Sequence, residues 1–236
     1  MLKLGTKWLD AVKALPLAVA MMGSGSLLAA DEGVNPDPWE NFNRKMFSFN
    51  DTLDRWTFKP VAEGYKKVTP EIVQTGVHNA FLNVGDGVNL LNNLLQGKLV
   101  DAGSDTGRIL FNTTLGIGGL FDVATWMGLP RHQEDFGQTL AVWGLGSGPY
   151  LVLPFFGPMT VRDGVGQVPD MFAQPYVYIN STAISAGAFA AQVIDTRADL
   201  LSKEKLITGD RYVFVRNAYL QNREFLAKDG KVVDDF

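Results

Sequence analysis

The sequence predicts an all-α protein with a single folded domain. Apolar residues recur at helical spacing in several stretches, and helix-start signals precede most of these stretches. The one long apolar run that could form a strand contains a proline, which removes a donor from a β-ladder. At 236 residues, the chain is long enough to bury a sizeable core.

The composition of the chain excludes several classes of function. Hydrophobic residues make up 46% and charged residues 19%, which indicates a folded protein. A net charge of −4 without basic clusters argues against nucleic-acid binding. The chain has no cysteine and only two histidines, which excludes disulfides, thiolate metal sites and a histidine-rich metal site. We therefore expect neither a metal nor a cofactor.

The amino terminus has the layout of a secretory signal. A basic segment precedes the apolar residues 14–22, a Gly-Ser break follows, and Leu28-Ala29-Ala30 ends the segment. We predict cleavage after Ala30, the alternative being an uncleaved anchor at residues 14–30. The predicted division into signal peptide, linker, folded domain and C-terminal tail is 1–30, 31–37, 38–229 and 230–236.

The first predicted helix begins at Asp37-Pro38-Trp39-Glu40, with aspartate as N-cap and proline at the first position. Its apolar residues form one stripe at spacings of four and three, and asparagines and aspartates occupy the other face. The stripe consists of Phe42, Met46, Phe49, Leu53 and Trp56. Such a helix suits a membrane interface, and it suits an ordinary helix bundle equally well.

Helices are also predicted in the middle of the chain. Thr69-Pro70-Glu71 begins one, and Asp86 is expected to cap a second that ends near Gln96-Gly97. A third, from about Leu99 to Leu115, has a polar edge that would be solvated surface in a helix bundle, or would face a central channel if the helices formed a ring. That edge consists of Asp101, Asp105, Arg108 and Asn112.

The apolar, glycine-containing segment Ile117–Leu129 has two interpretations. It forms a hairpin that dips into lipid with Trp126 at head-group level, or it packs within the protein. The following residues, 131–135, include histidine, glutamate and aspartate, which are residue types that bind metals. Consecutive side chains rarely converge on one ion, however, so no metal site is expected there.

The C-terminal third is expected to be helical as well. A short helix is predicted at 159–170, and a small-residue helix at 182–193, where Gly187 and nearby alanines would allow close backbone approach. A further short piece is expected at 195–201. Thr208-Gly209-Asp210 begins the last long helix, with Gly230 as a possible cap.

The stretch from Glu134 to Asp163 is the most distinctive in the chain. Its apolar part, Tyr150–Phe156, contains Pro154, which argues against both a central strand and a helix interior. We therefore predict irregular backbone with an apolar surface, held between glycine-rich turns. It would be a buried core loop, or backbone at membrane depth beside a cavity.

Catalytic motifs are not found. Gly144–Gly148 lacks the Lys-Ser/Thr pair of a phosphate loop, and Pro149 follows where a helix should begin. Ser147 lacks the flanking glycines of a nucleophile elbow. No carboxylate pair has a convincing acid–base partner, so we expect that the protein is not an enzyme.

Ordered motifs run along residues 37–226. They include Phe42-Asn43-Arg44, Lys59-Pro60-Val61-Ala62, Arg108 to Gly116, Glu134-Asp135-Phe136-Gly137-Gln138-Thr139-Leu140, Trp143-Gly144, Gly148-Pro149-Tyr150, Leu153-Pro154, Gly157-Pro158 and Arg162-Asp163. Together these motifs resemble the MlaA (VacJ) family. The resemblance implies a phospholipid transport protein that removes mislocalised phospholipid from the outer leaflet of the outer membrane. It also implies an all-α ring of mostly short amphipathic helices around an amphipathic channel, with irregular Gly/Pro-rich loops.

The resemblance further implies partners and a location. The ring would lie at the periplasmic face of the outer membrane, bound to a trimeric outer-membrane porin, and would pass lipid to a soluble periplasmic lipid carrier. Family members are lipoproteins, whereas Asp31 stands here where the acylated cysteine would follow Leu28-Ala29-Ala30. The alternative function is a soluble periplasmic helical scaffold without a channel.

Specific residues are expected to serve this function. Lipid tails in the channel would contact Tyr150, Leu151, Val152, Leu153 and Phe156. The membrane interface would be met by Trp39, Phe42, Phe49, Trp56 and Trp126. The structural motif consists of Glu134, Asp135, Phe136, Gly137, Gly144, Gly148, Pro149, Pro154, Gly157, Pro158, Arg162 and Asp163, of which the last two are expected to brace the loop by a salt bridge.

Overall fold

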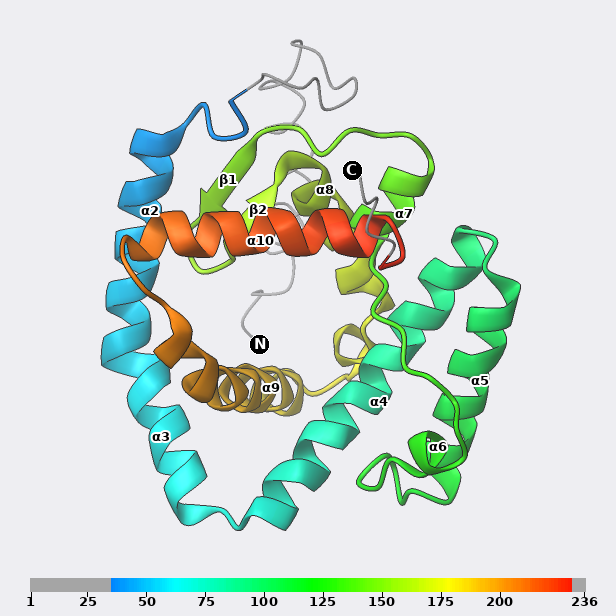
Figure 1. Cartoon of the computed structure of the whole chain (residues 1–236). Helices are drawn as coiled ribbons and strands as arrows, with labels where there is room; N and C mark the ends of the chain where they lie inside the picture. Colours follow the sequence, from blue (N-terminus) through cyan, green and yellow to red (C-terminus); the bar gives the residue numbers. More distant parts are fainter. Residues whose placement is uncertain (1–34, 231–236) are drawn as a thin grey trace, which may run out of the picture.

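A computed structural model describes residues 35–230, and these form a ring of helices with one small β-hairpin (Figure 1). The predicted signal peptide and most of the predicted linker and tail lie outside the described residues. In chain order the elements are α2 (Glu40–Leu53), a π-helical turn (Asp54–Phe58), α3 (Lys59–Val68), α4 (Glu71–Leu95), α5 (Leu99–Thr114), α6 (Val123–Trp126), α7 (Phe136–Val142), β1 (Tyr150–Leu153), β2 (Gly157–Thr160), α8 (Val161–Ala173), a 3₁₀ turn (Pro175–Tyr178), α9 (Thr182–Lys203), a second 3₁₀ turn (Glu204–Leu206) and α10 (Arg211–Ala227).

The wall of the ring begins with α2, the π-helical turn and α3, which run on from one another (Figure 1). Pro60 is the second residue of α3, so its missing N–H falls in the first turn of that helix. The predicted N-cap of α2 is wrong: the helix begins at Glu40, and Asp37 is fully buried and bonded elsewhere.

One long helix, α4, replaces the two helices predicted between Glu71 and Gln96. Asp86 lies inside this helix and caps nothing, because its carboxylate is buried against arginines of other segments. The helix ends as expected at Gln96-Gly97, where Gly97 takes a φ of 75°. The following helix, α5, packs back alongside α4 (Figure 1).

The prediction of irregular backbone at Tyr150–Phe156 is wrong for its first half. Tyr150–Leu153 is strand β1, paired antiparallel with β2 so that Tyr150 lies opposite Thr160 and Leu153 opposite Gly157. Pro154 sits in the connecting turn, outside the ladder, where its missing N–H costs no strand hydrogen bond. The left-handed φ of 79° at Gly157 closes the turn.

Three helices complete the ring after the hairpin. The side chain of Thr160 caps α8 by accepting a hydrogen bond from the Asp163 N–H at 3.2 Å. The pieces predicted at 182–193 and 195–201 form one helix, α9. Asp210 caps α10 as expected, and α10 then crosses the ring from one side to the other (Figure 1).

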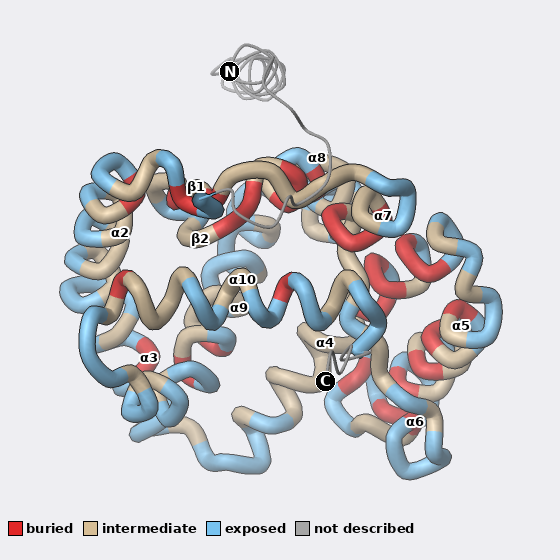
Figure 2. Tube along the Cα trace, turned by 45° about the horizontal axis from the view of Figure 1, so that its top comes forward, coloured by how far each residue is buried: buried red, intermediate tan, exposed pale blue. Residues whose placement is uncertain are grey.

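The buried interior is mainly polar. Among the described residues, buried polar and charged side chains outnumber buried apolar ones. Figure 2 shows the buried positions in short stretches of α4, α5 and α7 and around the hairpin, and very few on α3 and α9. The apolar core is a small cluster of Tyr150, Val152 and Tyr212, against which side chains of α2 and α10 pack.

Candidate functional site

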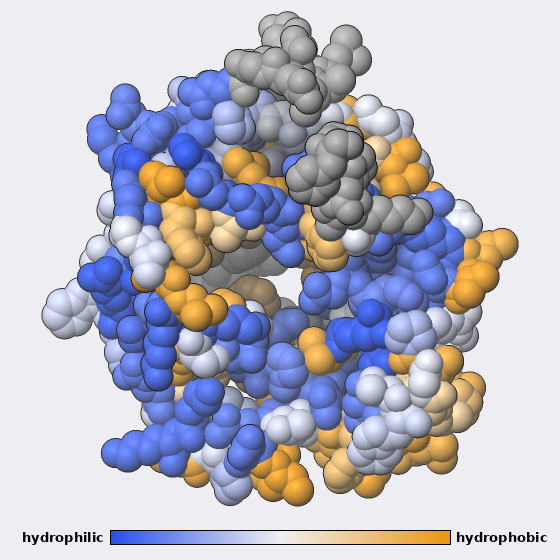
Figure 3. Space-filling model, viewed as in Figure 1, coloured by the Kyte–Doolittle hydropathy of each residue, from blue (hydrophilic) through white to orange (hydrophobic). Residues whose placement is uncertain are grey.

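An opening passes through the centre of the ring, and the space-filling view shows the background through it (Figure 3). It lies between α10 and α9, with α4 on one side and the α2–α3 wall on the other (Figures 1 and 3). Hydrophilic residues dominate its rim on this face. Hydrophobic residues gather at the outer edge, particularly over α5 and α6. This opening is the candidate functional site.

Helix α2 has its polar side inside and part of its apolar side outside. Asn43 is fully buried: its amide donates to the Tyr150 carbonyl at 3.0 Å and accepts from the Val152 N–H at 2.9 Å. Two turns later, Asn50 holds the hairpin turn by donating to the Leu153 carbonyl at 2.9 Å and accepting from the Phe155 N–H at 2.8 Å. The side of α2 that faces inward therefore carries buried polar groups, in addition to the apolar residues expected of a surface helix in a soluble protein.

Three aromatic side chains of that helix and of the π-helical turn after it face outward, whereas Phe47 of α2 packs against the apolar core. Phe42, Phe49 and Trp56 are 46%, 44% and 81% exposed, whereas Met46 of the same predicted stripe packs against the apolar core. Trp39 is half-buried. The predicted stripe is therefore split between the exterior and the hairpin, because the chain has to bond the hairpin backbone from this helix.

The hairpin presents two different faces. Tyr150 and Val152 are fully buried in the apolar core, which is a correction to their expected place on an open channel wall. Leu151 and Leu153, on the opposite face of the strand, are half-buried, and Phe156 is exposed in the connecting turn. Of the five predicted lipid-contact residues, only these three have side chains exposed enough to contact lipid.

A buried ion-pair cluster fastens α10 to the segment that surrounds the hairpin. Arg223 of α10 donates to the Asp135 carboxylate at 2.9 Å and to the Asp163 carboxylate at 2.8 Å, and the Tyr219 hydroxyl donates to Asp163 at 2.8 Å. Burial opposes ionisation of both acids, yet the bonds from Arg223 outweigh it and lower the pKa of each. The predicted brace at Arg162-Asp163 is thus centred on Arg223, which the sequence analysis missed.

The other motif residues serve the backbone around this cluster. Asp135 caps α7, and Gly137 lets α7 approach Gly166 of α8 so closely that a Cβ on Gly166 would lie 2.4 Å from the Gly137 nitrogen. Glu134 accepts a hydrogen bond from Lys98 at 3.1 Å. The rings of Phe136 and Trp143 are in edge-to-face contact. Gly144 and Gly148 have left-handed φ angles of 90° and 65°. The Pro149 carbonyl accepts a hydrogen bond from the Val161 N–H, and Pro158 lies in β2.

Gly187, predicted to allow close helix approach, does not do so. An added Cβ there would meet nothing within 4 Å. Gly137 and Gly166 have this role instead, and their close approach depends on tertiary packing that glycine content alone does not reveal.

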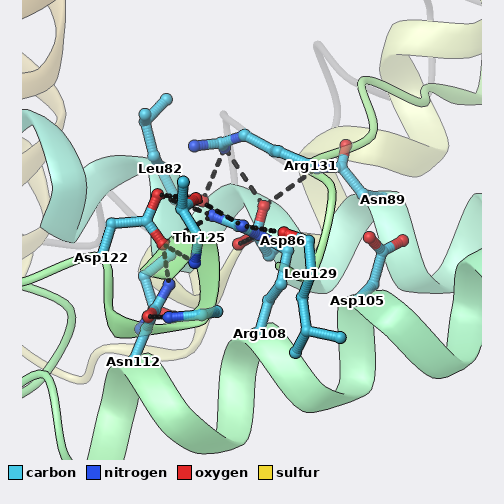
Figure 4. A network of polar contacts seen from close by, with 12 residues as sticks. Leu82, Asp86, Asn89, Asp105, Arg108, Asn112, Asp122, Thr125, Leu129 and Arg131 are labelled. Carbon is cyan, nitrogen blue, oxygen red and sulfur yellow. Dashed lines mark hydrogen bonds and ion pairs between the residues drawn. The ribbon is translucent and has the colours of Figure 1, made fainter. Parts of the chain in front are cut away.

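A second polar network holds α4, α5 and α6 together (Figure 4). Arg108 of α5 is buried between Asp86 of α4 and Asp122, with Nη2 3.0 Å from Asp122, and Arg131 contacts Asp86 at 3.2 Å. Burial raises the pKa of Asp86. It would also raise that of Asp122, but hydrogen bonds from Thr125, Arg108 and Asn112 lower the pKa of Asp122 to about 2.

This network corrects the interpretation of the α5 polar edge. Asp105, Arg108 and Asn112 are buried, so they neither form a solvated surface nor line the opening. Beyond them, Trp126 at the end of α6 is 75% exposed, which leaves its predicted place at a membrane interface as a proposal.

The two histidines are engaged in hydrogen bonds. His78 Nδ1 lies 2.8 Å from Asp195, and His132 Nδ1 lies 2.8 Å from Asp105. Within residues 35–230, no group of histidine and acidic side chains could hold a metal ion. No helix in the same range combines the length and the apolar character needed to cross a membrane.

Comparison with known proteins identifies the family. The model of the MlaA lipoprotein family matches residues 35–226, almost the whole described part of the chain. This chain belongs to the MlaA lipoprotein family. The expected motifs, from Phe42 to Asp163, all lie within the matched residues.

Members of the MlaA family with similar sequences come from several bacteria. The intermembrane phospholipid transport system lipoprotein MlaA of Escherichia coli K12 is 34% identical over 228 residues, covering 94% of this chain and 90% of the relative. The namesake protein from Haemophilus influenzae is 32% identical over 204 residues, covering 84% and 82%. An uncharacterised protein of Rickettsia felis is 39% identical over 192 residues, covering 80% and 76%.

A solved structure shares the MlaA fold. It comes from work on the structural basis for maintenance of bacterial outer membrane lipid asymmetry, and it is 36% identical to this chain. The TM-score is 0.71, with 81% of this chain and 98% of the other chain covered. The helical ring therefore belongs to a known architecture.

Proposed function

We propose that this protein transports phospholipid, removing mislocalised phospholipids from the outer leaflet of the outer membrane and so maintaining lipid asymmetry. The observation that carries the proposal is the opening, which has hydrophilic residues at its rim, together with the apolar residues that gather at the outer edge over α5 and α6 (Figure 3). A phospholipid needs both, since its head group is polar and its tails are not. The names of the relatives and the subject of the solved structure support the same function.

The exterior suits a ring that lies in one leaflet. Large apolar side chains are exposed along α2, α5 and the α5–α6 connection. In water each square ångström of such surface costs roughly 25 cal/mol, a cost that lipid tails remove. We propose that the ring sits in the inner leaflet at the periplasmic face of the outer membrane. The residues at the interface would be Trp39, Phe42, Phe49, Trp56 and Trp126.

Attachment without an acyl chain follows from the same surface. Asp31 occupies the position of the lipoprotein cysteine, and a single acyl chain would in any case give only marginal binding. The outward aromatic residues of α2 supply the apolar contact instead. Export through a cleaved N-terminal signal is part of this proposal.

Lipid passes through the opening along the half-buried face of the hairpin. Leu151, Leu153 and Phe156 give the tails an apolar surface, while Tyr150 and Val152 hold the hairpin in the core. The backbone polar groups of the hairpin are hydrogen-bonded within the β-ladder and to Asn43 and Asn50. Lipid tails beside the hairpin would therefore meet backbone N–H groups that already have partners.

The partners implied by this function are a trimeric outer-membrane porin and a soluble periplasmic lipid carrier. The porin would hold the ring in the membrane, and the carrier would collect the lipid at the periplasmic side. The relatives are named transport lipoproteins rather than enzymes, and we propose that this chain likewise catalyses no reaction.

A complementation experiment tests the function. A strain without its own family member should accumulate outer-leaflet phospholipid, measured by labelling with a reagent that does not cross the outer membrane. Expression of this chain should restore the wild-type level. Normal export and folding without any fall in outer-leaflet phospholipid would contradict the proposal.

A further inference from the structure

A cavity of about 680 Å³ lies where α3, the end of α9 and the start of α10 meet. We call it the basic pocket. Its charged lining consists of Lys59, Glu63, Lys66, Glu204, Lys205 and Arg211. Two of the elements that form it, α9 and α10, also border the opening (Figure 1).

Positive charge is in excess in the basic pocket. Four cations face two carboxylates. One of these, Glu204, is already held by Lys59 at 3.2 Å, Arg197 at 3.0 Å and Arg211 at 2.8 Å. Burial would raise the pKa of Glu204, but these bonds lower it to about 2, so it stays ionised and engaged.

Two lysines of the pocket are available for a ligand. Within residues 35–230, neither Lys66 nor Lys205 has a carboxylate within the 4.0 Å limit of a salt bridge. Both side chains are exposed, and they approach the cavity from different elements, α3 and the turn after α9. Leu201 and Ile207 add apolar surface to the same lining.

We propose that the basic pocket binds the phosphate of a phospholipid head group as the lipid enters or leaves the opening. The inference rests on the proposed function and names a contact for its substrate. The ammonium groups of lysines attract a phosphate as point charges, and the guanidinium of an arginine can donate two parallel hydrogen bonds to it. The apolar residues beside them suit the glycerol and the first tail carbons. A cavity of about 680 Å³ falls in the range of roughly 300–1,000 Å³ typical of ligand sites.

Two variants with equal charge change test the pocket. The variant K66E/K205E reverses both available lysines. The control K45E/K67E reverses two exposed lysines that do not line the cavity. The full chain in uncharged detergent would be titrated calorimetrically with short-chain phosphatidylglycerol below its micelle concentration, and protein-free micelles would supply the background. Glycerophosphoglycerol and inorganic phosphate serve as probes without tails.

The wild type and the control variant should bind the short-chain lipid equally. The pocket variant should bind about tenfold more weakly, equivalent to ~1.4 kcal/mol. Tail-free probes should bind the wild type much more weakly than the lipid. Equal lipid affinity in the wild type and K66E/K205E would overturn the inference, as would inorganic phosphate binding as tightly as the lipid, since that indicates a site for soluble phosphate.

Failure of the pocket and failure of the proposed function give different results. If the wild-type chain fails to lower outer-leaflet phospholipid in the complementation experiment, the proposed function is contradicted, whatever the pocket binds. Normal clearance together with unchanged lipid affinity in K66E/K205E contradicts the pocket alone. Thermal unfolding of both variants at the wild-type temperature shows that the fold is kept, as expected for exposed lysines.

Discussion

The guanidinium of Arg223 donates two hydrogen bonds to the carboxylate of Asp163, from Nε to Oδ2 at 3.0 Å and from Nη2 to Oδ1 at 2.8 Å. Arg223 is on α10, the helix that crosses the ring, and Asp163 is in the first turn of α8. This pair therefore fixes one end of the crossing helix to the segment that carries the hairpin.

Replacing Arg223 with methionine should lower the free energy of unfolding by roughly 3 kcal/mol, because the buried Asp163 would keep only one cation, Arg162 at 3.2 Å, and the half-buried Asp135 would lose its cation. Urea unfolding at pH 7 measures the change. In the control R55M, the lost pair is between Asp51 and an arginine whose side chain is 58% exposed. That change should be within about 1 kcal/mol. Equal midpoints for R223M and the wild type would show that the cluster adds no stability.

The contact between α7 and α8 predicts a strong effect of Gly166→Ala. The added Cβ would lie 2.4 Å from the Gly137 nitrogen, so the two helices must separate. We expect a loss of about 1–3 kcal/mol in unfolding free energy. Gly187→Ala in α9, where nothing lies within 4 Å, should instead be neutral or stabilise by up to about 1 kcal/mol. Similar values for both variants would argue against the close approach.

The two faces of the hairpin predict opposite results for neighbouring residues. Val152→Glu places a charge in the apolar core and should cost several kcal/mol, roughly 3 or more. Leu151→Glu, on the half-buried face, should fold, bind the porin and yet raise outer-leaflet phospholipid. Thermal unfolding, porin pull-down and outer-leaflet labelling give the three measurements. Unfolding of Leu151→Glu would mean that this face is also core.

The outward aromatic residues of α2 and of the π-helical turn after it predict a loss of membrane binding without a loss of fold. The variant F42D/F49D/W56D changes three exposed side chains, so its helical circular dichroism should remain and it should leave the outer-membrane fraction. In the control F47D, the charge replaces a ring that packs edge-to-face on Tyr212 at 5.6 Å, and this variant should unfold. A folded triple variant that stays in the membrane fraction would show that these residues do not anchor the ring. An unfolded triple variant would favour the soluble scaffold.

The depressed pKa of Asp122 predicts a specific acid sensitivity. Its folded pKa is about 2 against an ordinary 3.8, so its ionised form stabilises the fold above pH 4. That stability is lost as the pH falls through this window from 4 towards 2, because the folded protein must then take up a proton that the unfolded chain already holds. Asp122→Asn should destabilise the protein at pH 7, and its difference from the wild type should shrink as the pH approaches 2. Urea midpoints across that range measure it, and a constant difference would contradict the assignment.

Local signals in the sequence identified most of the helices. Thr69-Pro70-Glu71 and Thr208-Gly209-Asp210 mark the starts of α4 and α10, because caps and prolines act through a few neighbouring backbone groups. The same signals failed at Asp37 and Asp86. Both look like caps, but each is fully buried and bonded to residues far away in the sequence. Asp37 bonds Tyr212 and Arg216, and Asp86 bonds Arg108.

The hairpin was missed because the proline rule depends on a position that the sequence does not give. Pro154 excludes a strand only if it falls within the ladder, and here it falls in the turn. Likewise, the helical spacing of Phe42, Met46 and Phe49 predicted one apolar face. It could not indicate that Asn43 and Asn50 would turn inward to bond the hairpin.

By itself, the sequence determined that the chain is helical, that it has no cysteine for thiol chemistry, and which family it resembles, because these follow from local spacing, composition and ordered motifs. Tertiary structure alone decided which side of each element faces inward. Arg223 pairs with Asp163 across sixty residues of chain, and Tyr150 lies in the core while Leu151 faces away. These orientations depend on which distant groups pair with each buried charge and backbone donor. Those partners come together only when the ring is assembled.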